Sequence, residues 1–136
     1  TYSFFSNIAA KEDGTVYVLT ADDSRVNDEY RLIVERYSPD SQTWSIVGGY
    51  YPYVVDNHDL VKFAVAPDGT PYLLYYDKAN LKLNLTWIDS DTKQWAEPLV
   101  VATEDLSDIN IAFTTSGVGY IAFTDADNAE KVFIYR

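Results

Sequence analysis

The chain of 136 residues contains no cysteine, which excludes disulfide bonds, thiolate metal sites and a cysteine nucleophile. Its single histidine, His58, excludes metal sites built from several imidazoles. Basic residues are also few, with ten Lys and Arg against 21 Asp and Glu, so the formal net charge is −11. Because such an acidic chain repels phosphate backbones, the sequence predicts no nucleic-acid partner. No run approaches the roughly 18 apolar residues of a membrane-spanning helix, so no membrane span is predicted either.

Residues that favour β-strands dominate the composition. Aromatic residues make up 15% of the chain, with 12 tyrosines, and Val, Ile and Thr are frequent. Short apolar stretches alternate with turn signals such as Asp13-Gly14 and Asp68-Gly69, and Asp-Gly between two such stretches is a strong hairpin signal. No segment combines a capping box with a helical apolar stripe. The sequence therefore predicts an all-β, antiparallel chain of about eleven short strands.

A unit of about 50 residues occurs three times along the chain. Each copy places an alanine, a glycine, a tyrosine and an aspartate at matching positions: Ala9, Ala64 and Ala112; Gly14, Gly69 and Gly117; Tyr17, Tyr72 and Tyr120; Asp22, Asp77 and Asp125. An aromatic closes the expected third strand of each unit (Tyr37, Trp87 and Tyr135), and a tryptophan opens a fourth in the first two units (Trp44 and Trp95). This period, with four strands per unit, is typical of propeller blades.

On these residues the chain resembles β-propeller repeat proteins whose second strand carries a G-x-x-Y pattern. Residues 37–44 are also loosely similar to the third hairpin of kelch repeats, without the Gly-Gly pair of that family. The resemblance implies about three four-stranded antiparallel blades, near residues 4–47, 60–102 and 109–135, the last incomplete. A two-sheet sandwich is the alternative fold.

The number of repeats bears on the partners of the chain. Closed propellers usually have four to eight blades, more than the three units found here. We therefore expect either further blades from the rest of a longer chain or completion of a ring by other copies. Because no methionine opens the chain and it ends abruptly after Ile134-Tyr135-Arg136, we expect the first of these.

The loops that follow the second strands provide the first candidate site. Asp22, Asp77 and Asp125 begin these loops, and the resemblance implies that they open on a face that binds ligands. One interpretation is that each aspartate accepts backbone N–H bonds in its turn. The other is a ring of carboxylates for a cation or for sugar hydroxyls.

Three tyrosines in a loop between units form the second candidate site. Exposed side chains at Tyr50, Tyr51 and Tyr53 would suit a sugar or a peptide, although they could equally pack against a neighbouring blade. His58 lies nearby and is interpreted either as a ligand-binding residue or as an ordinary surface histidine. No cofactor is predicted apart from calcium. Asp125 and Asp127 are weak candidate ligands, because their spacing does not match that of a calcium-binding loop.

These features together predict a non-catalytic recognition module that binds a glycan or a protein. No nucleophile elbow accompanies the single histidine, and no catalytic residue is assigned. A carboxylate-based propeller hydrolase and a purely structural scaffold are the alternatives. Absence of cysteine and abundance of Tyr, Thr, Asn and Asp predict an extracytoplasmic location, either periplasmic, extracellular or at the cell surface.

Overall fold

A computed structural model describes residues 6–22, 31–52, 60–127 and 132–135. Within these ranges it does not describe the side chains of Ser6, Asp22 and residues 132–135. The described residues form strands, turns and bends without a helix, which confirms the prediction of an all-β chain. No helix in these ranges could therefore cross a membrane. Eleven strands are described: β1 Ser6–Ala10, β2 Val16–Asp22, β3 Arg31–Ser38, β4 Thr43–Tyr50, β5 Leu60–Val65, β6 Pro71–Asp77, β7 Lys82–Trp87, β8 Leu99–Ala102, β9 Leu106–Phe113, β10 Gly119–Asp125 and β11 Val132–Tyr135.

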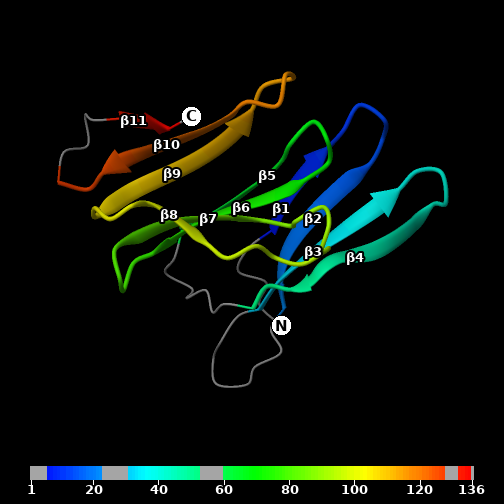
Figure 1. Ribbon diagram of the computed structural model, residues 1–136, viewed down its shortest axis with the longest axis horizontal. Helices are drawn as coiled ribbons and strands as arrows, with labels where there is room; N and C mark the ends of the chain where they lie inside the picture. The colour runs from blue at the N-terminus through cyan, green and yellow to red at the C-terminus, as the bar shows by residue number, and fades with distance from the viewer. Residues whose placement is uncertain (1–5, 23–30, 53–59, 128–131, 136) are drawn as a thin grey trace.

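The strands form three antiparallel sheets in which neighbours in sequence are neighbours in space. The first sheet has the order β1-β2-β3-β4, the second has the order β5-β6-β7-β8, and the third contains β9, β10 and β11. Figure 1 shows the three sheets in chain order, with the second sheet between the other two. Because the strands form three sheets, the alternative of a two-sheet sandwich is wrong.

Two apolar clusters separate the sheets, one on each face of the second sheet. The first cluster joins residues such as Leu19 and Val34 of the first sheet to Leu73 of the second. The second cluster joins Leu74 of the second sheet to Ile109 of the third. Adjacent residues in a strand point to opposite faces, so Leu73 and Leu74, both fully buried, belong to different clusters.

The sheets stack in one constant sense. Tyr17 belongs to the cluster between the first and second sheets, and Tyr72 packs against the cluster between the second and third. We call the side of each sheet that carries its Tyr17, Tyr72 or Tyr120 the tyrosine face, and the opposite side the back face. The tyrosine face of one sheet thus packs on the back face of the next. Tyr120, on the tyrosine face of the third sheet, is 39% exposed.

The first strands of the three sheets lie beside one another. β1 contacts β5, and β5 contacts β9, so the sheets converge along these strands (Figure 1). The hairpin turns that leave β1, β5 and β9 are consequently gathered at one end of the stack. This convergence positions the polar site described next.

Candidate functional site

Three hairpin turns with the same backbone hydrogen bonds form one end of the stack. In the first turn, the amide of Lys11 donates to the carbonyl of Thr15 at 2.9 Å, and the amide of Gly14 donates to the carbonyl of Lys11 at 3.1 Å. The turns at residues 66–70 and 114–118 repeat both bonds. Their glycines are Gly14, Gly69 and Gly117, with φ of 84°, 93° and 85°. A glycine in this conformation closes a three-residue hairpin loop, which is why this residue type recurs.

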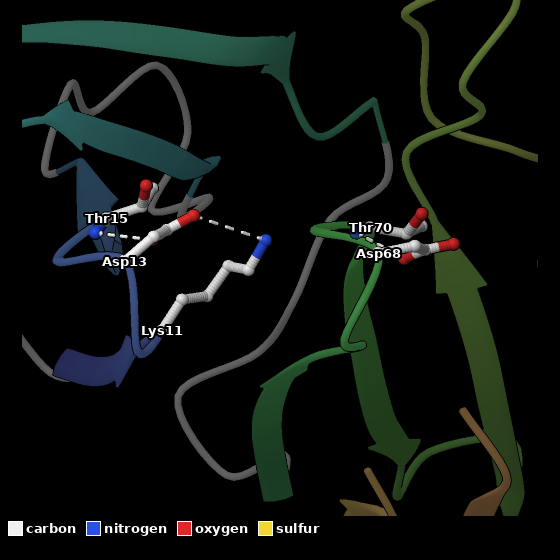
Figure 2. A network of polar contacts seen from close by, with 5 residues as sticks. All are labelled: Lys11, Asp13, Thr15, Asp68 and Thr70. Atoms are coloured by element: carbon white, nitrogen blue, oxygen red, sulfur yellow. Dashed lines mark hydrogen bonds and ion pairs between the residues drawn. The ribbon is translucent and has the colours of Figure 1, made fainter. Parts of the chain in front are cut away.

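Aspartate side chains fix the first two turns in the same way. Asp13 Oδ1 accepts the amide of Thr15, and Asp68 Oδ1 accepts the amide of Thr70, each at 2.9 Å (Figure 2). The third turn has no aspartate, and the hydroxyl of Thr114 accepts the amide of Val118 at 3.0 Å instead. The carboxylates are therefore held in position by the backbone of their own turns.

The side chain of Lys11 lies between the first of these turns and the second (Figure 2). Its ammonium lies 3.7 Å from Asp13 Oδ2, and Figure 2 shows it extending into the space between the two turns. A Cβ atom at Gly69 would come 3.5 Å from Lys11 Nζ and 3.3 Å from the hydroxyl of Tyr17. The absence of a side chain at Gly69 therefore leaves room for both groups at the junction of the sheets.

A cleft that contains charged side chains opens between the turns. It has a volume of about 420 Å³ and is lined by residues 10–13, 65–67 and 113–115, which come from all three sheets. We call it the turn-end cleft. An adjoining groove of about 380 Å³ between the first and second sheets shares Lys11 and Asp13 with it. The groove adds further charged side chains, namely Arg36, Asp68, Asp89 and Lys93.

The electrostatics of this end favour ionised carboxylates. The backbone hydrogen bond from Thr15 is the main cause that lowers the pKa of Asp13, helped by the Thr15 hydroxyl and by Lys11. The backbone hydrogen bond from Thr92 is the main cause that lowers the pKa of Asp89. Both groups are therefore charged acceptors at neutral pH and unsuited to donate a proton. What the cleft offers is fixed hydrogen-bonding groups of both charge signs.

A second cleft, of about 480 Å³, lies between the second and third sheets and has a different character. Its lining is mainly apolar, including Tyr72, Leu85, Leu99, Phe113 and Ile121. Specific ligand sites combine an apolar lining with a few oriented polar groups. Because the charged side chains gather at the turns, the turn-end cleft is the stronger candidate for a polar ligand.

The three predicted loop aspartates lie at the opposite end of the stack, where the second strands end. Asp77 accepts the amide of Asn80 at 3.0 Å and its side-chain amide at 2.7 Å. Asp125 accepts the amide of Asp127 at 2.9 Å. Asp22 ends β2 and pairs with Arg31 through the backbone, while its side chain lies outside the described residues. Where they are described, these carboxylates stabilise their own turns.

The predicted tyrosine cluster is divided by the fold. Tyr50 is 48% exposed, whereas Tyr51 is 2% exposed and packs edge-on against Tyr75 and Trp95, with ring centroids 5.7 and 5.2 Å away. Tyr51 is therefore part of the core and not of an exposed surface, as the packing interpretation anticipated. Two further predicted residues lie outside the described part of the chain, namely Tyr53 and His58.

The calcium candidates form no metal centre in the described part of the chain. No three of its His, Asp and Glu side chains are grouped to hold a metal ion. Asp125 and Asp127 are joined instead by the turn hydrogen bond described above.

Sequence reasoning missed the turn-end cleft and Lys11. The signal was present, because Asp13-Gly14 and Asp68-Gly69 mark equivalent turns, and Lys11 stands where the other repeats have Ala66 and Thr114. Comparison with known proteins adds no assignment, since no family model matches the chain and no curated protein is significantly similar to it.

Proposed function

We propose that the three sheets are consecutive blades of a β-propeller. The constant stacking sense supports this, because each tyrosine face packs on the back face of the next sheet and the first strands converge. Each sheet runs outward from its first strand in chain order, as blades do. The shared hydrogen bonds of the turns at Lys11–Thr15, Ala66–Thr70 and Thr114–Val118 also support a structural repeat.

We further propose that the chain is a non-catalytic recognition module that binds a glycan or a protein ligand in the turn-end cleft. The observation that carries this proposal is the pairing of Lys11 with Asp13 in a cleft to which all three sheets contribute. An ammonium donates and a carboxylate accepts, so the pair can hold the hydroxyl groups of a sugar or the polar groups of a peptide. The lowered pKa of Asp13 suits this role and does not suit general acid catalysis.

A glycan array probed with the 136-residue chain tests this proposal, followed by titration of any positive glycan. Hydrogen bonds to charged groups contribute about 1.5–3 kcal/mol, so Lys11→Ala should weaken binding by roughly ten-fold or more. Lys78→Ala removes the same type of charge from the exposed turn after β6 and should leave the affinity unchanged.

The same titration separates the alternative sites and functions. Loss of binding in Tyr50→Ala with full binding in Lys11→Ala would place recognition at the other end of the stack. Release of a shortened glycan product would contradict the recognition proposal and favour the hydrolase. The extracytoplasmic location remains part of the proposal, and fractionation of the source cells tests it.

A further inference from the structure

The back face of the first sheet carries several exposed apolar side chains. Ile8, Val18, Glu35 and Ile46 are paired directly across β1, β2, β3 and β4, so they lie on one face of the sheet. Ile8 is 74% exposed and Ile46 is 56% exposed. Trp44, in the neighbouring row, is 53% exposed. Glu35 is the one charged side chain of this row, and exposed large apolar side chains gathered on one face in this way indicate an interaction site.

The repeat shows what covers this face elsewhere in the molecule. Phe63 and Ile111 occupy the position of Ile8 in the second and third units. Phe63 packs against the first cluster, and Ile111 is 8% exposed within the second. In both sheets the covering surface is the tyrosine face of the preceding sheet. The same kind of surface would therefore fit the row that begins at Ile8.

A matching tyrosine face is exposed at the other end of the stack. The third sheet carries Asn110, Ala112 and Tyr120 at the positions of Asn7, Ala9 and Tyr17 in the first sheet. The face containing the first-sheet residues already packs on a back face, that of the second sheet. Tyr120 is 39% exposed, compared with 5% for Tyr17.

We infer that the tyrosine face of the third sheet docks on the back face of the first sheet of a second copy of this chain. The contact joins two different surfaces, so it is head-to-tail. Two copies arranged in this way bring six sheets together, which lies within the four to eight blades of closed propellers. This inference rests on the proposed assignment of the sheets as blades, and it requires no ligand.

Sedimentation velocity of the 136-residue chain over a range of concentrations tests this contact without any ligand. The expected result is a species with twice the mass of one chain that dissociates on dilution. Ile8→Lys should give monomers, because it places a charge in the docked row while the exposed position tolerates lysine in the free chain. Leu81→Lys is the matched control, since Leu81 is 41% exposed in the turn between β6 and β7, and it should remain dimeric. A wild-type chain that stays monomeric at every concentration overturns the inference.

A second variant tests the head-to-tail geometry. Tyr120→Lys alters only the tyrosine face and should also give monomers, whereas a back-to-back dimer would survive this change. Mixing Ile8→Lys with Tyr120→Lys should restore a dimer, because the intact tyrosine face of the first variant can dock on the intact back face of the second. A dimeric Tyr120→Lys protein or a mixture that stays monomeric overturns the proposed geometry. Circular dichroism of each variant establishes that the strands are retained.

Failure of this inference and failure of the recognition proposal are distinguishable. A monomeric chain that binds a glycan through Lys11 would overturn the dimer and leave recognition standing. A dimer that binds no glycan and no protein would overturn recognition and leave the dimer standing.

Discussion

The ring of Tyr72 in the second sheet lies against the ring of Phe113 in the third, with centroids 4.8 Å apart and planes tilted by 46°. This pair joins two sheets that share no backbone ladder. Burial is the main cause that raises the pKa of Tyr72, and the negative charge of Asp68 adds to it. The coupling energy of these two rings therefore reports on the packing of the second sheet against the third.

We expect a double-mutant cycle of Tyr72→Leu and Phe113→Leu to give a coupling energy of about 0.5–1.5 kcal/mol, as aromatic pairs usually do. Urea unfolding of the four proteins measures it. The control is a cycle of Tyr37→Leu and Trp44→Leu, a pair 5.3 Å apart within the first sheet. Because Trp44 is 53% exposed, the control coupling should be smaller. If the double variant loses the sum of the stability losses of the two single variants, the rings do not couple the sheets.

Two adjacent glycines at the end of β4 allow the cost of backbone strain to be distinguished from the cost of a steric conflict. Both have positive φ, 74° at Gly48 and 67° at Gly49. A Cβ at Gly48 would lie 2.7 Å from Ile88 Cδ1, whereas at Gly49 it would meet nothing within 4 Å. Gly49→Ala should therefore cost about 1–2 kcal/mol of unfolding free energy from strain alone. Gly48→Ala should cost roughly 1–3 kcal/mol more, because it also overpacks the contact with Ile88.

Thermal or urea unfolding of both glycine variants provides the measurement. Ile88→Val removes Cδ1 and keeps Cγ1, which would lie 2.9 Å from the added Cβ, so it should recover part of the stability lost in Gly48→Ala and none of that lost in Gly49→Ala. Equal losses at the two glycines would mean that Ile88 does not approach Gly48.

The stability of the chain should fall in acid as the turn carboxylates are protonated. The pKa values of Asp13 and Asp89 in the folded state lie below 3.8, so their ionised forms favour folding. This contribution is fully present above pH 3.8 and is lost as the pH falls through the folded pKa values. The double variant Asp13→Asn/Asp89→Asn should melt at a lower temperature than wild type at neutral pH, and this difference should shrink below pH 4.

Asp40→Asn, in the exposed turn between β3 and β4, controls for the loss of negative charge. Melting curves between pH 7 and 3 test the prediction. A difference between the double variant and wild type that stays constant over this range would contradict it.

Salt should strengthen the association of two copies. Each chain carries a formal net charge of −11, and the docked row is mainly apolar, so repulsion between the copies opposes a contact that gains little from ion pairs. The distance over which charges act on each other, the Debye length, shortens from about 10 Å at 0.1 M salt to about 3 Å at 1 M. The dissociation constant measured by sedimentation should therefore fall as sodium chloride is raised. A rise with salt would indicate that ion pairs hold the copies together.

The strands and their grouping could be predicted from sequence because the signals are local. Apolar alternation gives the strands, and glycine at residues such as Gly14 and Gly69 gives the turns whose hydrogen bonds the structure repeats. The row that each closing aromatic occupies could not be predicted. Trp87 pairs with Tyr72, whereas Tyr37 pairs with Val16 and Tyr135 pairs with Ile121, so the closing aromatics are not equivalent.

The physical reason for this difference is the position of the aromatic within each strand. The connections differ in length, yet Arg31 pairs with Asp22 and Lys82 pairs with the equivalent Asp77. Tyr37 lies six residues after Arg31, whereas Trp87 lies five residues after Lys82. A shift of one residue also moves a side chain to the other face.

The candidate site was predictable only in part. The turn hydrogen bonds of Asp77 and Asp125 follow from the chemistry of aspartate after a strand. The burial of Tyr51 could not be deduced, because it depends on Tyr75 and Trp95, which come from the next unit. The turn-end cleft likewise exists only where the convergence of β1, β5 and β9 brings three turns together.

Recognition in the turn-end cleft is tested most directly by mapping a bound ligand onto the backbone. The chain labelled with nitrogen-15 would be titrated with a glycan found positive on the array, and amide chemical shifts would be followed. The account predicts the largest changes at Lys11, Ala66 and Thr114, whose amides lie in the three turns that line the cleft. Large changes confined to Tyr50, Asn80 and Asp127, with these turn amides unmoved, would contradict it.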